Sequence, residues 1–277
     1  MSYANITRAV YHEPWAISRA GFATIKKVLS DHVASKAEVK IPHIKGERPT
    51  EDFFGQPIPQ YRNVNGVDVL PITGPLFKGA GLLEKLCGAT SYEDIQADLR
   101  ASMESKSPAL VLHINSPGGT VVGLTETGDM IRALAAQKMV VAFIDGLGCS
   151  AAYWLACSAS MIIATPSAIV GSIGTICELL DSSKAYDMQG LKVEQFTGGD
   201  LKGTGSDGVP LSDAQREWLQ QMVDAETVKF HDYVTTQRPG VSPDDMRGQW
   251  FMAQDCANKN LVDGFANSLE ECLKNIS

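Results

Sequence analysis

The sequence predicts an α/β fold with a mostly parallel sheet and flanking helices. From Val64 onward, apolar runs of strand length alternate with helical segments. The runs are continuous rather than alternately apolar and polar, which is typical of strands covered on both faces. The expected strands are VDVLPITG (67–74), ALVLHIN (109–115), MVVAFID (139–145), MIIATP (161–166) and LKVEQF (191–196).

Helical spacing and capping residues predict the elements between these strands. Ser91-Tyr92-Glu93-Asp94 resembles a capping box, and Ser212 with Gln215 caps a long helix expected over 212–235. A short helix, ECLKNI (271–276), is expected to close the chain. The expected buried stripes are Ile95, Leu99 and Met103; Leu124, Ile131 and Leu134 within 121–137; and Ala214, Trp218, Met222 and Ala225.

The first 62 residues differ in texture from the rest. Residues 1–40 are expected to be helical, and residues 41–62 contain four prolines and mixed charge, which is typical of a linker or docking arm. We therefore expect a helical extension with a proline-rich arm over 1–62 and the main domain over 63–277.

Composition excludes several classes of function. The chain has 277 residues, a net charge of −8 and no basic run, which argues against nucleic-acid binding. Its six cysteines form no CxxC pair, so reduced thiols in a cytoplasm are expected. The sequence contains no unbroken run of about 20 apolar residues, so no membrane span is expected. No HExxH motif or Cys/His cluster is present, so neither a metal nor a cofactor is expected.

The stretch HINSPGGTVVG (113–123) joins an expected strand to an expected helix through a tight turn. Pro117 fixes φ, and Gly118 and Gly119 let the backbone approach another group with no side chain in the way. N–H groups at a helix start attract negative charge. The turn is therefore either an anion-binding device or a simple tight connection.

A second strand-to-helix turn lies in FIDGLGCSAAYWLACSAS (143–160), where Ser150 begins the helix. Such a turn exposes a serine hydroxyl in several hydrolases, and the helix dipole favours developing negative charge there. The GxSxG pattern is incomplete because Ala152 replaces the last glycine. A plain N-cap serine is the alternative interpretation.

A nucleophilic serine needs a base. Among five histidines only His113 is near in sequence, and none has an evident aspartate partner, so a Ser-His-Asp triad has little support. Lys202, in the glycine-rich FTGGDLKGTGSDG (196–208), is the remaining candidate. A lysine with an ordinary pKa of about 10.4 is less than about 1% neutral at pH 7. Burial would have to lower that pKa for catalysis, and a solvated lysine is the alternative.

Four motifs in order, INSPGG, GCSAAYWLACSAS, ATPSAIVGSIGT and GGDLKGTG, resemble the SppA/protein C peptidase family. The resemblance runs from about Tyr61 to Phe265 and implies a Clp/crotonase-like fold of repeated ββα units. It implies a Ser-Lys dyad of Ser150 as nucleophile and Lys202 as general base, with the Ser172 hydroxyl orienting the lysine. It also implies an oxyanion hole formed by the N–H groups of Gly119 and Ala151, and no metal.

The N-terminal NITRAVYHEPWAISRAGFATI and YRNVNGVDVLPITGPLF resemble the phage protein C branch. The resemblance implies a protease that cuts scaffold, portal or capsid proteins inside the procapsid, in the bacterial cytoplasm. The bacterial membrane enzymes usually begin with an anchor, and some carry two copies of the domain; neither is seen here. Many phage members continue into a scaffolding tail, whereas this sequence stops at Ser277.

Family resemblance also implies extended protein or peptide substrates and a closed homo-oligomer in which the lysine reaches a neighbour's serine. The sequence permits an intra-chain or an inter-chain dyad. Helix 212–235 and the 41–62 arm are the segments expected at subunit contacts. Three alternative functions stay open: a bacterial signal-peptide-peptidase-like protease, an acyl-CoA hydratase or isomerase of the same fold, and a non-catalytic scaffold member.

Overall fold

The computed structural model describes residues 15–17, 48–52, 55–80, 84–85 and 87–276. Its centre is an eight-stranded sheet in the order β11-β10-β8-β6-β3-β2, with β9 paired to β8 and β12 to β9. Among the described strands of this sheet, β2 with β3 and β10 with β11 pair antiparallel and the other pairs are parallel, which confirms the predicted, mostly parallel sheet. The strands are β2 (Arg62–Val64), β3 (Val67–Thr73), β6 (Ala109–Ser116), β8 (Met139–Cys149), β9 (Met161–Ala164), β10 (Ile169–Gly171), β11 (Trp250–Met252) and β12 (Gly264–Phe265).

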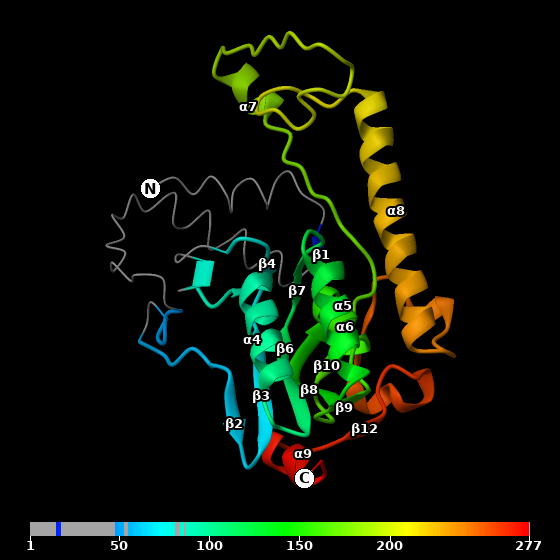
Figure 1. Cartoon of the computed structure of the whole chain (residues 1–277). Coiled ribbons are helices and arrows are strands. Elements are labelled where there is room, and N and C mark those ends of the chain that lie inside the picture. Colours follow the sequence, from blue (N-terminus) through cyan, green and yellow to red (C-terminus); the bar gives the residue numbers. More distant parts are fainter. Residues whose placement is uncertain (1–14, 18–47, 53–54, 81–83, 86, 277) are drawn as a thin grey trace.

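Helices cover both faces of this sheet, as the continuous apolar runs predict (Figure 1). One face packs against α4 (Tyr92–Glu104), α5 (Leu124–Ala135) and α6 (Ala151–Cys157), which contribute to the larger apolar core. The other face packs against α9 (Leu269–Lys274), where the expected C-terminal helix forms. Alternate residues of one strand therefore belong to different cores, as the two-residue period of a strand requires.

Strand β8 changes its partner halfway along, and this change sets the position of its end. Residues 141–144 pair with β9, whereas residues 147–149 pair with β10. Gly146, at the change, has φ 112, a conformation that side chains disfavour. The Leu147 N–H donates to Asn115 Oδ1 at 3.1 Å. The carboxyl end of β8 is thus held between β6 and β10.

A second, four-stranded sheet has the order β1-β7-β4-β5. Its strands are β1 (Trp15–Ile17), β4 (Leu76–Phe77), β5 (Thr90–Ser91) and β7 (Gly118–Thr120). Strand β7 follows β6 after the single residue Pro117, so the SPGG stretch carries the chain from the main sheet into the second one. Trp15–Ile17 form a strand where a helix was expected, and the other residues of 1–40 lie outside the described part of the chain.

The short helices start largely as the sequence predicts. Ser91 caps α4 by accepting from the Glu93 N–H, but the expected box does not close, and the Asp94 carboxylate pairs with Arg48 and Lys85 instead. The three residues predicted to form the buried stripe of α5 are buried. In α4, Ile95 and Leu99 are buried as predicted. The prediction for Met103 was wrong, since this residue lies in the last turn of the helix and is 37% exposed.

The long helix α8 (Asp213–Gln237) begins with the capping box predicted for Ser212 and Gln215. Its expected buried stripe was wrong: Ala214, Trp218 and Ala225 are exposed and Met222 is half-buried. The reason is that the buried apolar residues of α8, Phe230 and Val234, lie near its C-terminal end. Figure 1 shows its first turns extending away from the sheet.

Aromatic packing fixes that C-terminal end of α8. Tyr233 stacks on Trp154 of α6 at 4.1 Å between ring centroids, and Phe230 lies 5.1 Å from the same ring. The Ser158 and Tyr233 hydroxyls lie 2.7 Å apart. This contact anchors α8 to the helix that follows Ser150.

Residues 175–212 form an excursion that includes α7 (Ser183–Met188) and leads into α8. In Figure 1 the excursion extends away from both sheets. The predicted strand over 191–196 was wrong, because this segment has no strand structure and its apolar side chains are exposed rather than covered. Phe196 is 92% and Met188 is 89% exposed.

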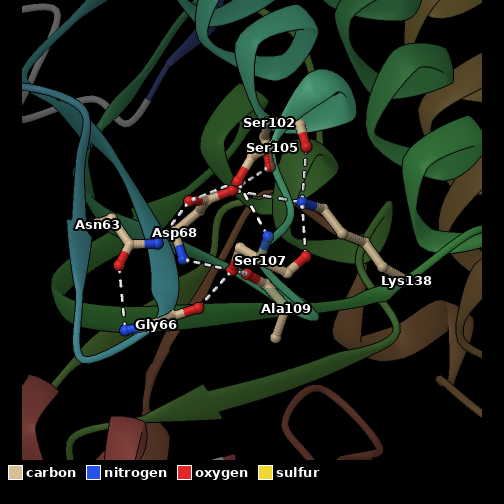
Figure 2. Close-up of polar contacts among 8 residues, drawn as sticks. All are labelled: Asn63, Gly66, Asp68, Ser102, Ser105, Ser107, Ala109 and Lys138. Carbon is tan, nitrogen blue, oxygen red and sulfur yellow. Dashed lines mark hydrogen bonds and ion pairs between the residues drawn. The ribbon is translucent and has the colours of Figure 1, made fainter.

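A buried polar network lies where β3 and β6 begin (Figure 2). The Asp68 carboxylate accepts from Asn63, Ser102, Ser105 and Lys138, and the Lys138 ammonium also donates to the Ser102 and Ser107 carbonyls. Burial alone would raise the pKa of Asp68, but these hydrogen bonds outweigh it and the pKa is lowered. Burial and the Asp68 carboxylate raise the pKa of Tyr61 to about 12. Both carboxylate oxygens of Asp68 and the ammonium of Lys138 thus have hydrogen-bond partners, so the network stabilises the fold.

Part of the proline-rich arm docks on α4. The Arg48 guanidinium donates to Asp98 Oδ2 at 2.6 Å and to the Asp94 carbonyl at 2.7 Å. Residues 41–47 lie outside the described residues, and the division at residue 62 remains an expectation. Among the helices that the structure describes, none combines the length and hydropathy that a membrane crossing requires. The six cysteines are free thiols in the structure.

Candidate active site

Ser150 lies on the turn between β8 and α6, in a strained conformation. Its φ of 55° and ψ of −121° lie outside the regions that side-chain residues normally adopt. The Ser150 N–H donates to the Gly171 carbonyl at 2.8 Å, and the Ser150 carbonyl accepts from the Trp154 N–H at 2.9 Å. Such strain costs about 1–3 kcal/mol and persists only where surrounding contacts hold it, most often at functional sites.

The Ser150 side chain does not cap the helix that it precedes. Its hydroxyl makes no capping hydrogen bond and instead donates to the Gly174 carbonyl at 3.4 Å. The N-cap interpretation of this serine therefore does not explain its side chain. The residue is 0% exposed, so a substrate can reach the hydroxyl only after a neighbouring segment moves.

Ser172 lies on the neighbouring strand end. In the β8–β10 pairing Gly171 is opposite Cys149, so the residues that follow, Ser172 and Ser150, leave the sheet side by side. Ser172 is also a non-glycine residue with positive φ, at 53°, and its N–H donates to the Gln249 carbonyl at 2.7 Å. The structure brings these two predicted site residues to one edge of the sheet.

The SPGG turn lies on the other side of Ser150. Ser116 of β6 is opposite Gly148 of β8, and the Ser116 hydroxyl donates to the Gly74 carbonyl at 2.6 Å. Strand β7, which carries Gly119, contacts α6, whose first residue is Ala151. A side chain at position 119 is impossible without movement, because its Cβ would lie 2.0 Å from the Leu76 carbonyl oxygen.

The candidate site therefore collects three backbone turns at the carboxyl ends of parallel strands. Open α/β sheets place ligands and catalytic groups at this edge. The Ala151 N–H belongs to the first turn of α6, where backbone donors have no partner within the helix. Such an arrangement can present a hydroxyl beside backbone donors.

Lys202 is not part of this group. It is exposed on the excursion, in a turn where its N–H donates to the Gly199 carbonyl at 3.1 Å. The excursion is held by its own contacts, such as the Gln195 amide to Ser206 Oγ at 2.6 Å and Tyr186 OH to Asp207 at 2.6 Å. Figure 1 shows the loop between α7 and α8 well separated from α6.

Sequence reasoning missed one histidine–carboxylate pair. His113 Nε2 lies 3.4 Å from Asp145 Oδ2, and its ring stacks on Phe143. Burial lowers the pKa of His113, although the Asp145 carboxylate opposes the shift. Strand register, which places His113 opposite Phe143, brings the pair together and could have predicted it. The His113 side chain shares a sheet face with Val111 in the α9 core, whereas α6 packs on the other face, so the pair does not form a triad with Ser150.

The geometry defines a Clp-protease-like α/β fold with a serine at a strained strand-to-helix turn. The sequence model of the Clp protease family matches residues 82–170, and the model of Peptidase family S49 matches residues 132–274. The S49 match covers more than half of the sequence and includes Ser150, Ser172 and Lys202. The chain belongs to peptidase family S49, which confirms the family and the fold class predicted from the motifs.

Two phage proteins are among its curated relatives. Head-tail preconnector protein GP5 of Enterobacteria phage P21 is 29% identical over 96% of this chain and 55% of its own length. Capsid assembly protease C of Escherichia phage lambda is 30% identical over 76% of this chain and 48% of its own length. A putative protease SohB of Buchnera aphidicola is 28% identical over 60% of this chain and 48% of that protein. The chain thus spans about half the length of these relatives.

Proposed function

We propose that this chain is a serine endopeptidase with Ser150 as nucleophile and Lys202 as general base. The strained Ser150 turn carries the proposal, because it holds an uncapped hydroxyl at a helix start beside the SPGG turn. Ser172, on the adjacent strand end, orients the lysine amine. The N–H groups of Gly119 and Ala151 form the oxyanion hole.

In the proposed reaction the neutral Lys202 amine accepts the Ser150 hydroxyl proton while Oγ attacks the scissile carbonyl carbon. The negative charge that develops on the carbonyl oxygen is stabilised by the two backbone N–H groups. One such donor is typically worth about 3 kcal/mol of transition-state stabilisation. The positive end of the α6 dipole at Ala151 adds to this stabilisation. The lysine then donates its proton to the leaving amine, and water releases the acyl group from Ser150.

We further propose that the lysine comes from a neighbouring copy in a closed homo-oligomer. Support comes from the exposure of Lys202. It also comes from the separation between the loop that joins α7 to α8, which carries Lys202, and α6, the helix that Ser150 begins (Figure 1). The excursion and α8 expose large apolar side chains that a second copy would cover, including Phe196 of the excursion and Trp218 and Val228 of α8. Delivery of the base by a neighbour would restrict catalysis to the assembled form.

The proposed substrates are extended segments of proteins that take part in phage head assembly, such as scaffold, portal or capsid proteins. This assignment is supported by the names of two relatives, a head-tail preconnector protein and a capsid assembly protease. An enclosed set of sites would admit unfolded or extended chains and exclude folded host proteins.

Labelling with a fluorophosphonate probe tests the nucleophile. We expect the native chain to be labelled, Ser150→Ala to be dark, and Ser158→Ala, a matched serine substitution at the other end of α6, to be labelled as the native chain is. Lys202→Ala should lose peptidase activity almost as completely as Ser150→Ala, since nucleophile and base act as a unit. Equal labelling of native chain and Ser150→Ala, or full turnover by Lys202→Ala, would overturn the assignment.

Ser172→Ala should retain more activity than Lys202→Ala, because Ser172 orients the base without reacting. With a lysine base, kcat/KM should rise with pH as the amine loses its proton. A profile that is flat between about pH 6 and pH 9 would contradict a lysine base.

A further inference from the structure

A short segment from the N-terminal region lies along the strand that carries Gly119. Strand β1 pairs antiparallel with β7, with Trp15 opposite Thr120, Ala16 opposite Gly119 and Ile17 opposite Gly118. On its other side β7 pairs with β4, with Leu76 opposite Gly119. Strand β1 therefore occupies what would otherwise be an open edge of the second sheet.

This edge borders the candidate site. Strand β7 starts two residues after Ser116, whose partner in the main sheet, Gly148, lies two residues before Ser150. Strand β7 also contacts α6, the helix that Ser150 begins. An extended backbone on the outer edge of β7 therefore lies against the strand that carries the proposed oxyanion glycine, and that strand in turn contacts the helix that Ser150 begins.

We propose that Trp15–Ile17 is an internal occupant of the edge along which an extended substrate docks, so that a substrate must displace it. The proposal rests on the assignment of Ser150 and Gly119 above. Extended peptides bind sheet edges through main-chain hydrogen bonds, and β1 demonstrates that this edge accepts a chain antiparallel to β7. Two of the three β7 residues are glycines, which is typical of a strand that another backbone approaches closely.

Two further observations support displacement. Among the described residues the β1–β7 ladder comprises three residue pairs, and so short a pairing is easily opened. Ser150 is completely buried and Gly118, Gly119 and Thr120 are buried beside it, so catalysis requires a segment near them to move. Because the occupant is part of the same chain, it competes at a high effective concentration with substrate in solution.

The test compares two full-length variants. Trp15→Pro/Ala16→Pro/Ile17→Pro removes the strand's N–H donors and its extended pairing, whereas Trp15→Val/Ala16→Thr/Ile17→Val keeps a strand-forming sequence as the matched control. Amide hydrogen exchange at Gly119 and Thr120 is followed by mass spectrometry, because the Gly118 N–H already donates to Ser116 Oγ within its own turn. We expect about tenfold faster exchange in the proline variant only. Adding a synthetic peptide of residues 11–21 should restore protection.

The kinetic readout uses an extended peptide substrate. The proline variant should show a KM lowered several-fold with kcat unchanged, and the peptide of residues 11–21 should inhibit it competitively. Equal exchange rates in the two variants, or no protection by the added peptide, would overturn the proposal. Absence of turnover and of fluorophosphonate labelling would instead refute the peptidase assignment. The exchange results report on the β7 edge in either case.

Discussion

The backbone strain at Ser150 predicts an unusual order of stability among inactive variants. Ser150→Ala and Ser150→Gly both remove the hydroxyl, so they differ mainly in backbone preference at φ 55° and ψ −121°. Glycine relieves about 1–3 kcal/mol of strain but costs about 0.5–1 kcal/mol through the larger entropy of its unfolded chain. We therefore expect Ser150→Gly to be about 1 kcal/mol more stable than Ser150→Ala, which raises Tm by about 2–4 °C.

A matched pair at Ser158 controls for the general effect of glycine. Ser158 ends the same helix with an ordinary φ of −76°, so Ser158→Gly should be less stable than Ser158→Ala. Differential scanning calorimetry of the four purified variants measures both differences. The same order at both positions, with alanine more stable than glycine, would refute the claim that the structure holds Ser150 under strain.

Three further outcomes are expected. Lys138→Met should lower the free energy of unfolding by about 3 kcal/mol, because it leaves the buried Asp68 carboxylate without its ion-pair partner. Urea denaturation measures this loss, and a loss below about 0.5 kcal/mol would contradict the prediction. The lowered pKa of Asp68 means that the stability it contributes is present above about pH 4 and is lost as pH falls. Asp68→Asn should therefore flatten the decline of Tm between about pH 5 and pH 3. Parallel Tm curves for the variant and the native chain would contradict this. Gly119→Ala should cost about 1–3 kcal/mol and abolish fluorophosphonate labelling, since its Cβ would strike the Leu76 carbonyl, whereas Gly198→Ala, with open space around it, should do neither.

The body of the fold could be predicted because its signals are local. Continuous apolar runs identified four strands of the parallel sheet, and Ser212 with Gln215 marked the start of α8. Burial of α8 could not be predicted in this way. Its apolar residues Trp218 and Met222 have helical spacing, but spacing does not reveal whether another element lies against that face.

The strand prediction within the excursion was wrong for the same reason. Residues 191–196 read as a strand, yet a strand needs a neighbouring strand, and the sequence does not say whether one is present. At the site, the motifs located the Ser150 turn. Its strain, the pairing of Ala16 with Gly119 and the separation of the α7–α8 loop from α6 (Figure 1) depend on tertiary contacts instead. The 51 residues that lie between Ser150 and Lys202 fit either a shared or an internal dyad.

Subunit complementation tests the central claim most directly. Inactive Ser150→Ala and inactive Lys202→Ala are mixed in equal amounts under conditions of subunit exchange, and native mass spectrometry verifies that mixed oligomers form. If Lys202 serves a neighbour's Ser150, random pairing restores about one quarter of the sites, and peptidase activity appears in proportion. Mixed oligomers without any recovered activity, or a monomer with full activity, would contradict the shared site.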